Sequence, residues 1–335
     1  MKYENLDVLI LTCNRAEYLK IQLDSIFQSS ADWRETVIID NASTDHTQDV
    51  VKQAMEKYPN RKVRVIRHEQ NIGNAGNFKF SQSVSDNEYV AIFHDDDAIH
   101  PEYIDRAMYL LQENKNAVIC TGGAEGLYNV NNENWSMLPN EYILYPQTRG
   151  GGGFYQMLLG RANFMCCIYR TSAYRQVKYR PDLYGKLHDI FFLMEMNKLG
   201  DVIFQQGVVV RWRQHFQSDS NSLSSGPFPV EVLQLIGSIK RMLYKDKENF
   251  ENVELYNNVS AALLYNFAYF LYKWSYLAKY LAWDDFRRKM IKERIFTKED
   301  YAAFDKYMDT FYNPIIMQQA GKLREENRHQ YYFHV

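Results

Sequence analysis

The first 121 residues alternate short apolar runs with amphipathic segments, and this alternation sets the fold class. Runs of five to seven residues rich in Val, Ile and Leu suit buried strands, and the segments between them have helical length. Strands that alternate with helices in this way predict βαβ units and a mostly parallel sheet flanked by helices, an α/β fold. The expected strands are 6–11, 36–40, 62–68, 88–93 and 117–121, and the expected helices are 16–28, 44–58, 75–84 and 101–114.

The rest of the chain changes character twice. Residues 122–163 are irregular and rich in Gly, Asn and Tyr, after which we expect a strand at 162–170, a helix at 186–200 and a strand at 208–215. Beyond the "SGPFP" segment the chain is almost wholly helix-like. We therefore predict a catalytic domain over 1–226 and an all-helical C-terminal region over 227–335.

Bulk composition excludes several classes of protein. The net charge of −2 over 335 residues argues against a nucleic-acid binder. The four cysteines have no CxxC spacing, which favours buried thiols over a disulfide framework. No N-terminal signal pattern and no run of about 18 apolar residues is present, so we expect a cytoplasmic protein.

Polar clusters follow four of the expected strands. They read "TCNR", "DNASTD", "HEQNIGNAGN" and "HDDD". Ligands of open parallel sheets bind at the carboxyl ends of the strands, so these distant clusters are expected to converge on one site.

Three adjacent aspartates, Asp95, Asp96 and Asp97, directly follow the apolar run "YVAIF". Neighbouring carboxylates resist ionising together, and a divalent cation would relieve their repulsion. The alternative is a solvated turn without a ligand.

Four segments resemble, in their order and spacing, the motifs of the family 2 glycosyltransferases, which have the GT-A fold. These segments are "LILTCNRAEYLKIQLDSI", "VIIDNASTDHTQ", "NIGNAGN" and "FHDDDAIHPEYI". The resemblance covers roughly residues 5–220. It implies a nucleotide-sugar donor, most often a UDP-sugar, and transfer to a hydroxyl group with inversion.

The resemblance also implies roles for residues around the donor. Asp40 matches the position that binds the nucleobase. The loop beneath the nucleotide and the N-x-G segment near it correspond to Thr12, Asn14, Arg15, Asn71 and Gly73. For the Asn and Gly cluster, a plain tight turn is the alternative.

The D-x-D motif of the family corresponds to Asp95 and Asp97, which would hold Mn²⁺ or Mg²⁺ against the donor diphosphate, while Asp96 would either face the ribose or be solvated. The segment "RWRQHFQSDS" resembles the end of the family's catalytic core. There Arg213 and His215 would reach the diphosphate, and His215 would be a metal ligand or a structural histidine at a strand end.

The segment "LHDIFFLMEM" matches the family's acidic helix start. Asp189 is the expected general base, which takes the proton of the acceptor hydroxyl. His188 replaces the usual first acid, and the alternative for Asp189 is a helix cap.

In the C-terminal region, Tyr265, Tyr269, Tyr272, Tyr276 and Tyr280 form one helical stripe. Three interpretations stay open for it: core packing, a homo-oligomer interface, or a membrane-surface contact. The basic run 286–294 is either a solvated helix face or a site for acidic headgroups, and the membrane alternative would place the protein at the inner membrane face.

The resemblance to this family thus implies a metal-dependent hexosyl- or N-acetylhexosaminyltransferase of polysaccharide biosynthesis. Its expected partners are a UDP-sugar and a glycan or lipid-linked glycan acceptor. A sugar nucleotidyltransferase would need a glycine-rich loop after the first strand, and "TCNRAEYL" has no glycine. The alternative from another class is a catalytically silent carbohydrate-binding scaffold that keeps the fold.

Overall fold

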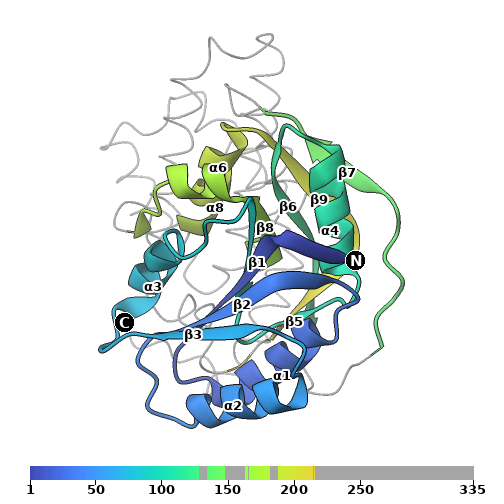
Figure 1. Cartoon of the computed structure of the whole chain (residues 1–335). Helices are drawn as coiled ribbons and strands as arrows, with labels where there is room; N and C mark the ends of the chain where they lie inside the picture. Colours follow the sequence, from blue (N-terminus) through green and yellow to red (C-terminus); the bar gives the residue numbers. More distant parts are fainter. Residues whose placement is uncertain (128–133, 148–162, 165, 182–187, 214, 216–335) are drawn as a thin grey trace, which may run out of the picture. The chain divides into compact units, whose positions relative to one another are not determined.

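The computed structural model describes residues 1–127, 134–147, 163–164, 166–181, 188–213 and 215. These residues form a mixed α/β structure with a large central sheet flanked by helices, as predicted (Figure 1). The predicted helical region 227–335, with its tyrosine stripe and basic run, lies outside the described residues. The boundary at 226 and the helical extension therefore stay predictions.

The amino-terminal part builds the parallel side of the sheet, in the strand order β3-β2-β1-β4. The predicted strands and helices of this part are confirmed to within a few residues. Their bounds are β1 Lys2–Thr12, α1 Ala16–Phe27, β2 Asp32–Asp40, α2 Thr47–Lys57, β3 Val63–Arg67, α3 Gly73–Ser81 and β4 Tyr89–His94.

The remaining strands extend the sheet beyond β4 in the order β8-β6-β9-β5, and β7 pairs with β9. Strand β8 is antiparallel to β4, with Cys167 opposite Ile92. The bounds are β5 Ala98–Ile99, α4 Tyr103–Glu113, β6 Ala117–Leu127, β7 Tyr142–Tyr145, β8 Cys166–Arg170, α6 Thr171–Gln176, α8 His188–Asn197 and β9 Asp201–Arg213. The elements β5, β7 and α6 were not predicted because they are too short to show a period.

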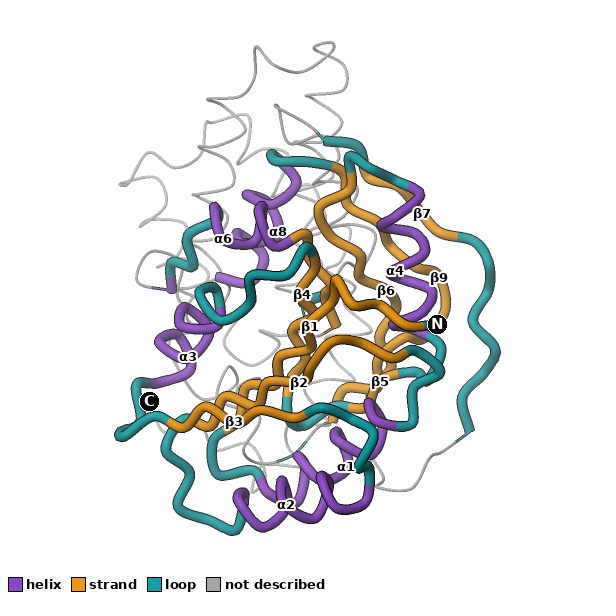
Figure 2. Tube along the Cα trace, in the orientation of Figure 1, coloured by secondary structure: helices purple, strands orange, loops and turns teal. Residues whose placement is uncertain are grey.

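Both faces of the sheet are covered, because consecutive residues of β1 are buried and their side chains point to opposite faces. Val8 and Ile10 of β1 pack in one core cluster with Leu19 and Leu23 of α1. Figure 2 shows α1 and α2 side by side on this layer.

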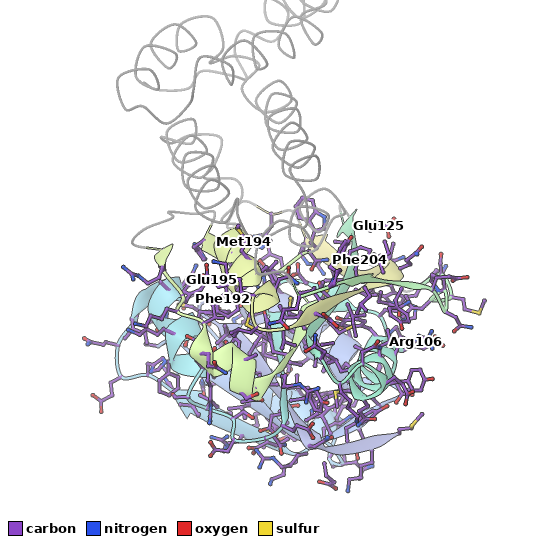
Figure 3. The ribbon with its side chains drawn as sticks, turned by 90° about the horizontal axis from the view of Figure 1, so that it is seen from above. Arg106, Glu125, Phe192, Met194, Glu195 and Phe204 are labelled. Carbon is purple, nitrogen blue, oxygen red and sulfur yellow. The ribbon has the colours of Figure 1, made fainter. Side chains whose placement is uncertain are left out.

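A separate group of aromatic rings includes Phe78 of α3 and Phe192 of α8, whose centroids lie 5.4 Å apart. Phe192 and Met194 of α8 are almost fully buried, and Figure 3 labels both together with Glu195 of the same helix. Helix α8 is thus fixed in place by its apolar side chains.

All four cysteines are free thiols; Cys120, Cys166 and Cys167 are buried, as predicted, whereas Cys13 is half-buried. Within the described part of the chain, no helix is both long and apolar enough to cross a membrane.

Candidate active site

The polar clusters that follow β1, β2, β3 and β4 meet at one edge of the sheet, as predicted. Asn14, after β1, accepts a hydrogen bond from the Thr44 backbone nitrogen at 2.7 Å. Asn41, after β2, donates to the Asn71 side-chain oxygen at 2.9 Å. Segments separated by about 30 residues in sequence are therefore tied together by direct hydrogen bonds.

The loop after β1 is held in one conformation. Thr12 is buried at the end of the strand. Asn14 has a φ of 54°, a left-handed conformation that asparagine tolerates better than most residues. Its backbone nitrogen donates to Ser43 Oγ at 2.9 Å, and the following Arg15, the residue before α1, reaches the aspartates.

Asp40 ends β2 and is fully buried. Its Oδ1 accepts a hydrogen bond from the Ser43 backbone nitrogen at 2.9 Å, and its Oδ2 accepts one from Gln48 Nε2 at 2.7 Å. Arg67 Nη1 lies 3.6 Å from the same Oδ2. Both carboxylate oxygens thus hold the turn after β2, and a contact of Asp40 with a nucleobase stays a prediction.

Asn71 and Gly73 form a tight turn before α3. Asn71 Oδ1 accepts from the Gly73 backbone nitrogen at 2.8 Å, and Gly73 has a φ of 75°, where a side chain would be strained. This geometry agrees with the alternative that was left open for the segment. The hydrogen bond between Asn41 and Asn71 still places this turn at the edge of the sheet where the other polar clusters meet.

One guanidinium nitrogen connects two of the three aspartates. Arg15 Nη1 donates to Asp95 Oδ1 at 3.0 Å and to Asp96 Oδ2 at 2.9 Å. Burial and the neighbouring Asp96 charge raise the pKa of Asp95 to about 6, although Arg15 opposes this. Burial would also raise the pKa of Asp96, but Arg15, His94 and His215 together hold it below its ordinary value.

Asp97 differs from its two neighbours. Its Oδ1 accepts a hydrogen bond from the Arg213 backbone nitrogen at 3.1 Å, but its buried Oδ2 accepts none from the residues that the structure describes. Burial, with the Asp96 charge as the next cause, raises the pKa of Asp97 well above its ordinary value. A buried carboxylate oxygen without a donor is unfavourable, and a divalent cation would satisfy it.

A cluster of possible metal ligands surrounds this oxygen. One ligand atom each from His94, Asp96 and Asp97 lies within 4.8 Å of the others. The two carboxylates suit Mn²⁺ and Mg²⁺, so the residues fit the expected cofactor. His94 was not among the predicted site residues, although its place three residues before Asp97 at the strand end was a usable signal.

The end of β9 reaches the same cluster. Arg213 Nε donates to the Asp96 backbone oxygen at 3.2 Å, and His215 Nε2 lies 3.0 Å from Asp96 Oδ2. The His215 ring stacks on Tyr18 of α1 with centroids 4.1 Å apart. The structure therefore brings Arg213 and His215 to the aspartates, while their predicted contacts with diphosphate and metal stay predictions.

Asp189 lies in the first turn of α8 and is partly buried. Burial raises the pKa of the Cys167 thiol, and Asp189 is one of the smaller causes. Burial raises the pKa of Cys166 to about 11, and Asp97 is among the smaller causes there. The charges of Asp97 and Asp189 therefore act on adjacent thiols at the start of β8, and the role of Asp189 as the general base stays a prediction.

His188, which stands where an acid was expected, belongs to the aromatic group instead. Its Nε2 contacts the Tyr179 hydroxyl, and the two rings lie edge to face with centroids 4.3 Å apart. Tyr179 in turn stacks on Phe78 at 4.2 Å. His188 is therefore built into the packing between α3 and α8.

Comparisons with known sequences agree with this geometry. The sequence profile described as Glycosyl transferase family 2 matches residues 7–179. An uncharacterized glycosyltransferase of Nostoc sp. is 31% identical over 107 residues, which are 32% of this chain and 33% of that protein. An uncharacterized protein of Mycobacterium tuberculosis is 31% identical over 93 residues, 28% of this chain and 27% of that protein. The alignments thus span a third or less of these relatives.

Solved structures show the same fold. Residues 1–349 of S. aureus TarS, in complex with UDP-GlcNAc, give a TM-score of 0.54 at 18% identity, covering 91% of this chain and 80% of that one. The mannosyltransferase PcManGT of Pyrobaculum calidifontis, in complex with GDP-Man and Mn²⁺, gives 0.50 at 12% identity, covering 98% and 88%. The predicted GT-A fold class is thereby confirmed.

Proposed function

The chain belongs to glycosyl transferase family 2, and from that premise we propose that it transfers a sugar from a nucleoside diphosphate donor to a hydroxyl group, with a divalent cation at Asp97. The observation that carries the proposal is the buried Asp97 Oδ2, which no described residue satisfies by a hydrogen bond. A cation at this oxygen would sit where the carboxyl ends of β1, β2 and β4 meet.

The donor side of the site would be built by the segments that converge there. Thr12, Asn14, Arg15, Asn71 and Gly73 would line the nucleotide. Asp95 and Asp96 would face the ribose and the phosphates, and Arg213 would bind the diphosphate. When bound, Mn²⁺ or Mg²⁺ would offset the negative charge that develops on the departing nucleoside diphosphate.

Arg15 limits how the aspartates can act. Its guanidinium neutralises part of the charge on Asp95 and Asp96. Asp97, whose Oδ2 has no hydrogen-bond donor among the described residues, is thus the carboxylate best placed for the cation. Of the predicted ligands Asp95, Asp97 and His215, we therefore retain Asp97 as the principal one.

We assign the general base to Asp189. A partly buried carboxylate in the first turn of a helix can accept a proton from an acceptor hydroxyl when it is within hydrogen-bond reach. TarS, of like fold, was solved with UDP-GlcNAc, which supports a UDP-sugar as the first donor to test. We propose a glycan or lipid-linked glycan as the acceptor and an inverting transfer in the cytoplasm.

Replacement of Asp189 by Asn tests this assignment. Release of UDP would be followed with UDP-Glc, UDP-Gal, UDP-GlcNAc and UDP-GalNAc, each with Mn²⁺ and a panel of glycan acceptors. The Asp189→Asn protein is expected to bind UDP and Mn²⁺ as the wild type does but to lose transfer by at least two orders of magnitude.

Asp86→Asn is the matched control, because Asp86 is a highly exposed carboxylate that pairs with Arg175. It should transfer at the wild-type rate. Wild-type protein that binds UDP but transfers no sugar under any condition would favour the silent scaffold.

A further inference from the structure

We propose that His94 is a ligand of the divalent cation, together with Asp97 and Asp96. The inference rests on the proposed function, because it needs a cation at the end of β4. It adds an imidazole ligand to the proposed cation site. This ligand is His94, whereas the sequence analysis predicted His215.

The strand geometry directs His94 toward this position. Side chains alternate along β4, so Phe93 packs in the core cluster with α1 while His94 points to the opposite face. On that face its ring lies 6.2 Å from the Phe164 ring, and its side chain is 38% exposed. The turn through Asp95 and Asp96 then returns the chain so that Asp97 faces His94.

The two facing atoms have a spacing that suits one shared ion. His94 Nδ1 lies 3.8 Å from Asp97 Oδ2. Two ligand atoms of an octahedral ion with bonds of about 2.1 Å lie roughly 3 Å apart when adjacent and about 4.2 Å when opposite. The observed distance is shorter than the span of two such bonds, so one ion can reach both atoms, and it is too long for a hydrogen bond.

The unsatisfied oxygen is an independent observation that points to the same position. Asp97 Oδ2 is buried and accepts no hydrogen bond from the described residues, while the other oxygen, Oδ1, is held by the Arg213 backbone nitrogen. Burying a carboxylate oxygen without a partner costs free energy, and a cation between this oxygen and the His94 imidazole would remove that cost.

His215 is held differently. Its Nε2 lies 3.0 Å from Asp96 Oδ2, which also accepts from Arg15, and its ring is stacked on Tyr18. The geometry therefore gives the two histidines separate tasks: His94 faces the open oxygen of Asp97, and His215 positions Asp96.

An imidazole ligand would change the metal preference of the site. Nitrogen ligands favour the later divalent metals, whereas Mg²⁺ favours a shell made only of oxygen. The wild-type protein should therefore prefer Co²⁺ and Mn²⁺ to Mg²⁺, and His94→Gln should lose much of this preference.

Electron spin-echo spectroscopy of bound Mn²⁺ gives a direct test, because a coordinated imidazole nitrogen modulates the echo. The full-length protein would be labelled with ¹⁵N-histidine and measured with Mn²⁺ alone and with Mn²⁺ plus UDP. Wild type, His94→Gln and the matched variant His215→Gln would be compared. We expect a histidine nitrogen coupling in wild type and in His215→Gln, and its loss in His94→Gln.

The other outcomes separate this inference from the proposed function. If Mn²⁺ binds without a histidine nitrogen coupling, or if only His215→Gln loses the coupling, His94 is not a ligand although the metal-dependent site stands. If no Mn²⁺ binds with or without UDP, both proposals fail. The wild-type spectrum alone can contradict the inference, so the test does not depend on the stability of the variants.

Discussion

Arg15 Nη1 donates a hydrogen bond to Asp96 Oδ2 at 2.9 Å, which joins the loop after β1 to the turn after β4. The same nitrogen reaches Asp95 Oδ1, and both carboxylates are almost fully buried. The guanidinium is therefore the main charge that allows this pair of carboxylates to ionise without a metal.

Replacement of Arg15 by Met should destabilise the metal-free protein at pH 8 by about 3 kcal/mol, because it leaves buried carboxylates without their partner. Urea unfolding in EDTA measures this loss. Excess Mn²⁺ should restore part of the stability, since the ion offsets the same charge.

Lys198→Met is the matched control, because it breaks the more exposed pair with Glu195 and should cost no more than about 1 kcal/mol. Equal losses in the two variants would show that Arg15 does not hold the aspartates together.

Tyr18 should act as a positioning residue through its ring. It stacks on His215 at 4.1 Å, and the Arg213 guanidinium lies 5.7 Å from its ring centroid. Tyr18→Phe keeps this surface and should bind UDP with Mn²⁺ as the wild type does, whereas Tyr18→Ala should bind it at least several-fold more weakly. Calorimetric titration with UDP distinguishes the two, and equal weakening in both variants would assign the effect to the hydroxyl instead.

His100 predicts a pH effect on stability outside the metal cluster. The Glu102 backbone nitrogen donates to its Nδ1 at 3.1 Å, and its Nε2 lies 3.0 Å from the Ser136 oxygen. Burial lowers the pKa of His100, opposed by the contact with Ser136. The unfolded chain therefore binds the proton more readily, and the contribution of His100 is full above pH 6.5 and is lost as the pH falls below it.

Thermal unfolding at pH 7.5 and pH 5.5 checks this effect. His100→Gln should lose less stability between the two pH values than the wild type does. A steeper loss in the variant would mean that protonation of His100 stabilises the fold.

The sequence predicted the parallel half of the sheet, because the period of its apolar residues identifies the strands and helices. It also predicted that the polar loops meet, because parallel strands end at the same edge of the sheet. It did not predict β5 or β7, which depend on pairing with β9. Nor did it predict that β8 enters antiparallel between β4 and β6, since an apolar run does not encode its direction.

At the site, the sequence indicated which carboxylates come together but not which hydrogen-bond or charge partners each of them has. Arg15 and Asp40 were predicted at the nucleotide, yet here the first pairs with two aspartates and the second holds its own turn. His94 was missed although its place at the end of β4 was a signal, because its approach to Asp97 also depends on the turn between them.

The most direct test of the account is calorimetric titration of UDP into the full chain with Mn²⁺ and with EDTA, for wild type and Asp97→Asn. The Asn side chain keeps the shape of Asp97 but removes the charge that would hold the ion. We expect Mn²⁺-dependent UDP binding in the wild type and its loss in Asp97→Asn. UDP binding of equal strength in both proteins, or binding that EDTA leaves unchanged, would contradict a metal-dependent donor site at Asp97.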